Sequence, residues 1–319
     1  MYNFLITYFS TDKSKLTSYW EKSKSWEWDR IWSIGTKPDN IWWAIELYSF
    51  DQKKILKKIE IAKPMAIIQI KDWFICSDAF NNIIFLDSLL KITSIEKCNL
   101  LNSIHSIVKW KDDSNIIFSS TWLDSVVICD INSISTWKIL WTAQWSKYWL
   151  FPNWLSREIN FLDDHSKASY PTLMQTTHLN SSFLDWDLLY VSLFHQWIMI
   201  SVNLKTWKIS ELLKWMSCPH GIHKYNINGK DYFIISDTKH NKVFYDIEID
   251  NNLVKTYKTL EDWFNWVQDT KYFPELSIIS VLDSNNNRVV FYSYPNMNKI
   301  SEYNFEKNNR VYDIILVNE

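Results

Sequence analysis

Glycine is almost missing from this chain. The 319 residues include 3 Gly, whereas a soluble protein of this length would use roughly 22, at about 7%. Tight turns with a positive φ normally contain glycine, because other residues are strained in that conformation. The same sequence contains 20 Trp, and Gly and Trp together number 23. The shortage of one residue type therefore matches the excess of the other.

Other absences exclude broad classes of function. The net charge is -2, so no basic surface for nucleic acid is indicated. No apolar run reaches the roughly 18 residues of a membrane-spanning helix, and the N-terminal MYNFLITYFSTDK lacks the basic flank of a secretory signal. We therefore expect no nucleic-acid partner, no membrane association and a cytoplasmic location. The four cysteines form no C-x-x-C pair, and we expect buried, reduced thiols.

The positions of the tryptophans suggest a reassigned codon. Trp137 and Trp207 lie between predicted strands in STWKI and KTWKI, and Trp186 lies in LDWDL, where Asp-Gly would form a hairpin turn. We interpret most of these residues as Gly in the native protein, with UGA read as glycine by the host. Lys outnumbers Arg 30 to 4, which fits an AT-rich genome. Trp141 and Trp266 have apolar or aromatic neighbours and are candidates for genuine tryptophan; the alternative is a chain that is Trp-rich throughout.

A repeated unit predicts the fold. Residues 178–249 contain the unit twice, each time as a histidine, a short strand, a polar turn, an apolar strand ending near Ser or Asp, and a further strand. Such spacing is typical of propeller blades. We predict an all-β closed β-propeller that spans residues 1–319 as one domain, with six four-stranded blades, or seven if residues 11–43 hide strands. The units are 44–61, 65–97, 104–141, 178–214, 219–260 and 263–305.

Two further segments complete this prediction. Residues 1–10 and 310–318 both read as strands and would share one sheet, which closes the ring and leaves no open edge. Residues 142–177 break the repeat, and we expect an insertion that lies over one face. With Trp read as Gly, positions 26, 28 and 32 resemble a dinucleotide loop, but no βαβ pattern follows, so a surface loop is the preferred interpretation.

The repeated histidines are the main candidates for a site. His105, His178 and His220 each precede a predicted innermost strand, and equivalent residues of successive blades meet at the axis of a propeller. We expect the three imidazoles on one face near the axis with Asn180 beside them, where they would bind a ligand or a divalent metal ion. The alternative is a structural role in binding the backbone. His223 is expected on the opposite strand face or just beyond the site.

Other catalytic patterns are missing from the sequence. No G-x-S-x-G, P-loop, H-E-x-x-H or EF-hand motif occurs, even with Trp read as Gly. Asp78, Asp124 and Asp237 recur after apolar strands. Such carboxylates usually accept hydrogen bonds from loop N–H groups, and we keep Asp237 as a candidate ligand-binding residue as well.

The stretch PHGIHKYNINGKDYFIISDTKHNKVFYDI (219–247) resembles a blade of NHL-type and gluconolactonase-like propellers. THLN (177–180) and PHG (219–221) are more specifically similar to an uncharacterised bacterial propeller family. In gluconolactonase-like enzymes an Asn of a Pro-Asn-Gly motif and a later Asp help to bind a divalent metal. The resemblance places His220 and Asp237 at these positions, so the chain departs from the motif at the Asn.

Two functions follow from these patterns. The first is a binding scaffold that takes a partner protein or a small ligand at its loop face and central channel. The second is a metal-dependent hydrolase or lyase, similar to the lactonases, with a His-rich axial site.

Overall fold

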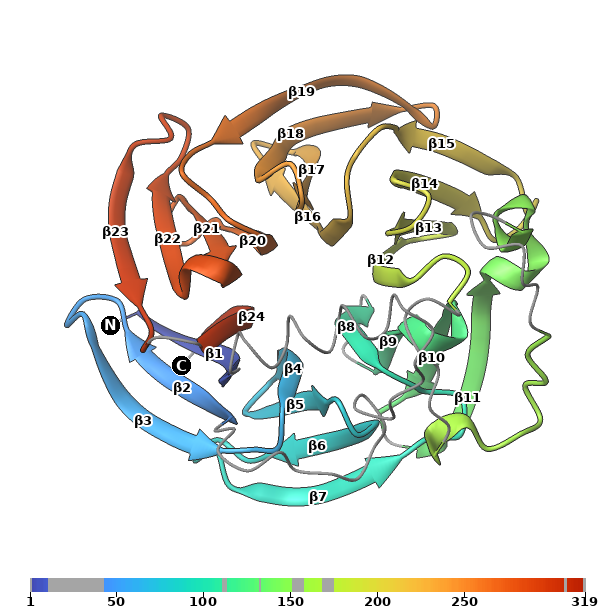
Figure 1. Ribbon diagram of the computed structural model, residues 1–319, viewed down its shortest axis with the longest axis horizontal. Coiled ribbons are helices and arrows are strands. Elements are labelled where there is room, and N and C mark those ends of the chain that lie inside the picture. Colours follow the sequence, from blue (N-terminus) through green and yellow to red (C-terminus); the bar gives the residue numbers. More distant parts are fainter. Residues whose placement is uncertain are drawn as a thin grey trace, which may run out of the picture.

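The computed structural model describes residues 2–10, 43–110, 114–131, 133–150, 158–167, 175–306 and 309–317. Six four-stranded antiparallel sheets stand around a central axis in chain order (Figure 1). The predicted six-bladed all-β propeller is confirmed. Strands of a seventh blade or a surface loop were predicted in residues 11–43, of which 11–42 lie outside the described residues.

In each blade the four strands follow one another from the innermost, next to the axis, to the outermost. Blade 1 contains β24 (Asn309–Val317), β1 (Asn3–Ser10), β2 (Trp43–Ser49) and β3 (Lys54–Glu60); blade 2 contains β4 (Pro64–Ile70), β5 (Trp73–Asp78), β6 (Asn82–Leu86) and β7 (Ile92–Lys97); blade 3 contains β8 (Ile104–Trp110), β9 (Asn115–Ser120), β10 (Ser125–Asp130) and β11 (Ser133–Thr142). Blade 4 contains β12 (Leu179–Asp185), β13 (Leu188–Leu193), β14 (Ile198–Asn203) and β15 (Ile209–Leu213); blade 5 contains β16 (Pro219–Ile227), β17 (Lys230–Asp237), β18 (Lys242–Asp250) and β19 (Leu253–Glu261); blade 6 contains β20 (Val267–Phe273), β21 (Ile278–Asp283), β22 (Arg288–Ser293) and β23 (Lys299–Asn304).

The two ends of the chain share blade 1. β1 pairs with β24 in an antiparallel ladder that runs from Asn3 opposite Val317 to Ser10 opposite Asn309. The predicted pairing of residues 1–10 with the C-terminal strand is therefore observed. Because the last strand completes the first sheet, the ring closes through backbone hydrogen bonds as well as side-chain packing.

The core lies between the blades. Six clusters of buried apolar residues each join two neighbouring blades, and Phe4 and Phe291 meet in the cluster between the first blade and the last. A middle strand such as β21 is buried at every position, whereas the outermost strand β3 is exposed at nearly every position. Hydroxyls join the blades near the axis as well: Thr7 Oγ1 donates to Met65 O over 2.6 Å, and Ser77 Oγ to Ile104 O over 3.1 Å.

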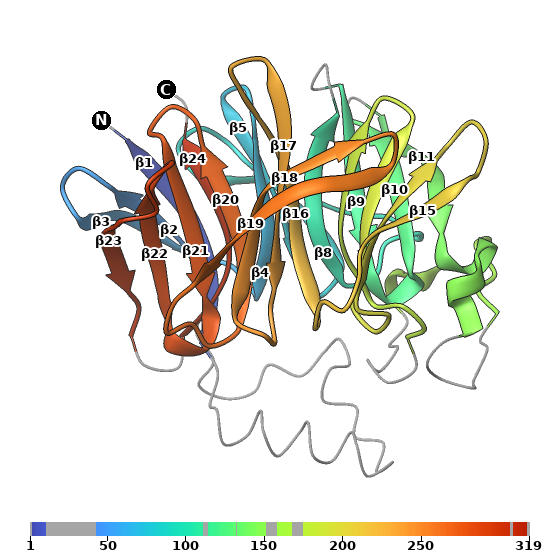
Figure 2. The ribbon, with the colours of Figure 1, turned by 90° about the horizontal axis from the view of Figure 1, so that it is seen from above.

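Short 3-10 helices lie on the face of the ring at which the inner strands begin (Figure 2). They are η2 (Thr121–Leu123), η3 (Ala143–Trp145), η4 (Lys147–Leu150), η5 (His165–Lys167) and η7 (Ser284–Asn286). The described part of the predicted insertion includes η3, η4 and η5. Of these, η5 packs on the loops of blades 2 and 3, because Asn81 and Asn102 donate hydrogen bonds to Ser166 O and His165 O. The full extent 142–177 stays a prediction, since 151–157 and 168–174 lie outside the described residues. None of the described helices has the length and apolar character that a bilayer crossing requires.

Several tryptophans occupy the conformation that favours glycine. The two that the repeat placed in turns, Trp186 and Trp207, have φ of 56° and 58°. Trp137 is different, because it lies within β11 opposite Cys129 and is absent from the positive-φ residues. Trp141 is 1% exposed in the core, as expected of a genuine tryptophan. Trp266, the other expected genuine case, has φ of 68°.

Candidate axial site

The inner strands are irregular near their starts. The ladder between each inner strand and its neighbour shifts register at this point, for example at His105 between Ile104 and Ser106 in β8. A bulge of this kind turns one side chain out of the regular alternation. We call the residue that follows the first paired position, or stands at the bulge itself, the bulge-position residue. From blade 1 to blade 6 it is Tyr312, Met65, His105, Asn180, His220 and Gln268.

This register corrects one prediction from the sequence. His105 and His220 hold equivalent positions, but Asn180 holds that position in blade 4, and His178 lies two residues before it. His178 instead belongs to a set with positive φ, each member two residues before the bulge position; the set comprises Lys63, Ser103, His178, Cys218 and Trp266. The three histidines nevertheless approach one another, and the ring centroids of His105 and His178 are 5.2 Å apart.

A small cavity lies on the axis. Five of the six bulge-position residues line it, all except Met65, together with the inner-strand residues that follow them. His105, Asn180 and His220 are therefore brought together as expected, whereas His178 stands behind His105 and is not part of the lining. The cavity volume is about 30 Å³, and a water molecule needs roughly 10–15 Å³ of such space. The enclosed space is therefore large enough for a small polar group and too small for a whole cofactor.

The axial histidines are neutral at physiological pH. Burial, the neighbouring His220 and the cation of Lys63 lower the pKa of His105 to about 3. Burial lowers the pKa of His220 to about 4, and burial with His105, His195 and His220 nearby holds that of His178 well below its usual value. Desolvation disfavours the charged imidazolium in each case. Neutral rings keep one nitrogen available as an acceptor.

Hydrogen bonds orient two of these rings. His220 Nδ1 lies 2.9 Å from Cys218 O and 2.8 Å from Thr238 Oγ1, and His178 Nδ1 contacts Gln175 Oε1. His105 differs from both. The Asn180 side chain lies within hydrogen-bonding reach of the His105 ring and raises its pKa against the effect of burial, but no well-formed hydrogen bond joins His105 Nδ1 to the described residues.

Three buried polar atoms around the cavity lack partners. Asn180 Oδ1, His105 Nδ1 and Tyr312 Oη are each shielded from solvent and make no hydrogen bond within the described part of the chain. They come from β12, β8 and β24, and all three residues line the cavity. Asn180 is 2% exposed, and its Nδ2 donates to Pro219 O over 3.3 Å. Buried polar atoms nearly always have a partner, so three at one place indicate a missing one.

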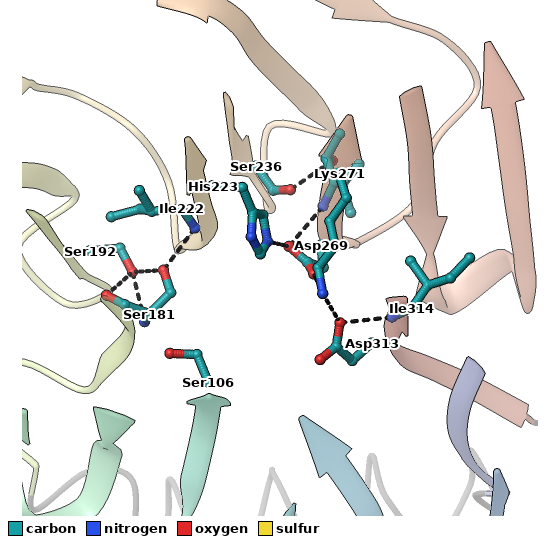
Figure 3. A network of polar contacts seen from close by, with 12 residues as sticks. Ser106, Ser181, Ser192, Ile222, His223, Ser236, Asp269, Lys271, Asp313 and Ile314 are labelled. Carbon is teal, nitrogen blue, oxygen red and sulfur yellow. Dashed lines mark hydrogen bonds and ion pairs between the residues drawn. The ribbon is translucent and has the colours of Figure 1, made fainter. Parts of the chain in front are cut away.

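Next to these atoms lies a charged network that the sequence did not reveal. His223 Nε2 is 2.8 Å from Asp269 Oδ1, Lys271 Nζ is 3.7 Å from Asp269 Oδ2, and Lys271 also bonds to Asp313 (Figure 3). His223, expected away from the axial site, therefore lines it. Burial raises the pKa of Asp313, whereas the positive charges of His223 and Lys271 outweigh burial and hold the pKa of Asp269 well below its usual range.

Gly221 makes room for this network. Its φ is 58°, and a Cβ added there would stand 1.8 Å from Asp269 Oδ1. A carboxylate from β20 therefore reaches the backbone of β16 only because this residue has no side chain. Gly221 follows His220 in the PHG motif, so the one glycine of the inner strands is set by a close approach that no local pattern discloses.

The recurrent aspartates tie loops, as the sequence suggested. Asp124 accepts the N–H groups of Thr176 and Thr177 over 3.0 and 3.1 Å. Asp78 accepts that of Phe80 over 2.8 Å, and Asp237 accepts that of Ser217 over 2.6 Å. The second oxygen of Asp237 bonds to His240, and Asp237 does not line the cavity. A direct role of Asp237 in ligand binding stays a prediction.

The described residues hold no group of three His, Cys, Asp or Glu side chains in an arrangement suited to a metal ion. Two of the three histidines nonetheless have an oxygen partner on Nδ1, as metal-binding imidazoles usually do. A divalent ion at His105, His178 and His220 therefore stays a prediction, and no chemical step is derived through it.

Comparison with known proteins shows the fold alone. No family model and no curated protein matches the chain. Similar solved structures include a nidogen/laminin complex (TM-score 0.64, 11% identity, 98% of each chain) and a Bacteroides caccae protein of unknown function (0.63, 8%, 100% of each chain). A streptogramin B lyase is also similar (0.53, 14%, 86% of this chain and 83% of that one). Since 1380 chains match, the propeller fold is too widely shared to select a function.

Proposed function

We propose that this propeller is a binding module that takes a small ligand from its loop-bearing face and places one polar group of that ligand in the axial cavity. The observation that carries the proposal is the set of three unpartnered atoms on Asn180, His105 and Tyr312. Leaving a buried polar group unpaired costs about 1–3 kcal/mol, and a ligand that pairs all three would recover that cost. The neutral state of the axial histidines supports hydrogen bonding rather than charge pairing at these positions.

A metal-dependent hydrolase or lyase is the second candidate. The Nδ1 partners of His178 and His220 favour it, because an imidazole held through Nδ1 can present Nε2 to a metal ion. The similar streptogramin B lyase is an enzyme by its name, but the shared fold does not transfer that activity. Metal analysis of the purified protein tests this candidate: one divalent ion per chain, lost on replacing His178 with Ala, would support it.

Binding is tested with three probes of matching size: formamide, formate and methylammonium. Each is titrated to about 100 mM at constant ionic strength while the melting temperature is followed. At least one probe is expected to raise the melting temperature of the wild type in a saturable way. The rise should vanish in Asn180→Leu and persist in Asn304→Leu, a control on the exposed strand β23. If no probe does so, the binding proposal is rejected.

A further inference from the structure

We infer that the polar group taken by the axial cavity is a primary ammonium, so that the natural ligand carries a protonated amine. This inference rests on the proposed binding function and names its ligand class.

Carboxylates outnumber lysines in the lining of the cavity. Asp269 and Asp313 provide two carboxylates, each about 10% exposed at the side chain, and Lys271 provides one cation. His223 supplies a second positive charge only while it is protonated beside Asp269, so the lining has a net charge of -1 while His223 is neutral and no net charge while it is protonated. Isolated charge is costly in a site shielded from water. While His223 is neutral, a cationic ligand would restore neutrality and an anionic one would double the imbalance.

The unpartnered atoms match an ammonium group. Asn180 Oδ1 accepts hydrogen bonds and cannot donate, because it is the carbonyl oxygen of the amide. His105 is neutral, since its pKa is about 3, so its Nδ1 is an acceptor when the proton is on Nε2. Tyr312 Oη accepts as well as donates. Three acceptor atoms without a partner among the described residues thus belong to residues that line one cavity, and a primary ammonium has three N–H donors.

A further cation, Lys63, acts on the site from outside the residues that line the cavity. Lys63 acts on the His105 ring and lowers its pKa. Burial and the neighbouring Arg310 in turn lower the pKa of Lys63 to about 7. At neutral pH Lys63 is thus charged for only part of the time, and an ammonium entering the cavity would further favour its neutral form.

Space limits what enters. A volume of about 30 Å³ accommodates a group the size of one or two water molecules, which an ammonium head satisfies. Quaternary ammonium is larger and has no N–H to donate. The cavity therefore discriminates between a primary amine and its methylated form by both size and hydrogen bonding.

The experiment compares chloride salts of ammonium, methylammonium and tetramethylammonium with formamide and sodium formate, at equal ionic strength. Ligands of one or two heavy atoms reach dissociation constants of about 10 mM at best. At ten times that concentration, ammonium or methylammonium should raise the melting temperature by about 2 °C. Tetramethylammonium should give no more than sodium chloride.

Two substitutions at one position predict opposite results. Asn180→Leu removes an acceptor and should abolish the shift, whereas Asn180→Asp adds a carboxylate of the same shape and should reach half of the shift at a lower methylammonium concentration, by about tenfold. Each variant is compared with its own unliganded melting temperature, and Asn304→Leu is the control. The inference is overturned if formamide or formate alone shifts the wild type, in which case the binding function stands. It is also overturned if tetramethylammonium equals methylammonium. If no probe shifts the protein, the inference and the proposed function both fail.

Discussion

The ring uses the same left-handed backbone at its axis and in its exposed turns, with different residues. At the axis, Gly221 has φ of 58° and an Asp269 oxygen where a Cβ would stand. In the exposed turns, Trp186 between β12 and β13 and Trp207 between β14 and β15 have φ of 56° and 58° and are 72% and 52% exposed. The axial position requires glycine for two reasons, the backbone conformation and the lack of space. The turn positions favour glycine for the backbone conformation alone, so a large residue fits there at the cost of strain.

Replacing Gly221 with Ala should have the largest effect. The added methyl group combines left-handed strain of about 1–2 kcal/mol with a steric overlap that typically costs about 1–3 kcal/mol more. We therefore expect a loss of about 2–5 kcal/mol in the free energy of unfolding, measured by urea denaturation. The control is Gly229→Ala, where φ is 81° and no atom lies within 4 Å of the new Cβ. Equal losses in both variants would show that Asp269 moves aside freely and that space at the axis is not limiting.

Acid should lower the free energy of unfolding through the buried axial histidines. The pKa of His220 is lowered to about 4 in the folded state, and that of an unfolded histidine is about 6.5. Between these values the unfolded state binds more protons, so stability is full above pH 6.5 and falls as the pH drops towards 4. The slope from one such group approaches about 1.4 kcal/mol per pH unit, or about 2 kcal/mol between pH 6.5 and 5.

His220→Asn tests this assignment, because blade 4 already has Asn180 at the equivalent position. The variant should show a shallower decline of unfolding free energy below pH 6.5, measured by urea titration at several pH values. A decline as steep as that of the wild type would place the acid sensitivity elsewhere, for example in the carboxylates.

The sequence predicted the blades well because their signal is local. Each blade alternates apolar and polar residues between polar turns, and the pairing of residues 1–10 with the C-terminal strand follows from ring closure. Register carries no such signal. One bulge residue in β12 moves Asn180 into the place that the histidine spacing assigned to His178, and a shift of one residue reverses which side chains face the axis.

The repeat pattern could not predict the charged network around Asp269, for a related reason. Asp269 and Asp313 come from blades 6 and 1, whose inner strands contain no histidine at the bulge position. His223 meets Asp269 across 46 residues of chain. Only the closed ring brings these strands together. The single sequence signal was Gly221 itself, a glycine retained within a strand, which often marks a close approach of another chain segment.

The smallest change in the free energy of unfolding per site is expected in the exposed turns. Replacing Trp186 or Trp207 with Gly removes about 1–2 kcal/mol of left-handed strain, while the added freedom of glycine in the unfolded chain costs about 0.5–1 kcal/mol. Each variant should therefore gain about 0.5–1 kcal/mol in the free energy of unfolding. Trp141→Gly is the opposite control, because this buried indole fills the core and its loss should cost at least about 3–5 kcal/mol. If both Trp186→Gly and Trp207→Gly destabilise the protein, the packing of these two indoles contributes more than the strain of the backbone costs.

That energy difference bears on which residue the native host inserts. Among the described residues, five tryptophans have positive φ, namely Trp186, Trp197, Trp207, Trp215 and Trp266, and the first four are at least 52% exposed. A bulky residue gains little from such a position, whereas glycine adopts it without strain. The hypothesis that UGA encodes glycine explains both the positions and the shortage of glycine. It predicts Gly at 137, 186 and 207 in peptides of the protein purified from its host. The residue at 137 is the sharpest case, since Trp137 has no positive φ and its assignment rests on the shared T-W-K-I sequence alone. Mass spectrometry that finds Trp at 186 and 207 would end the hypothesis, and Trp at 137 alone would limit the reassignment to the turns.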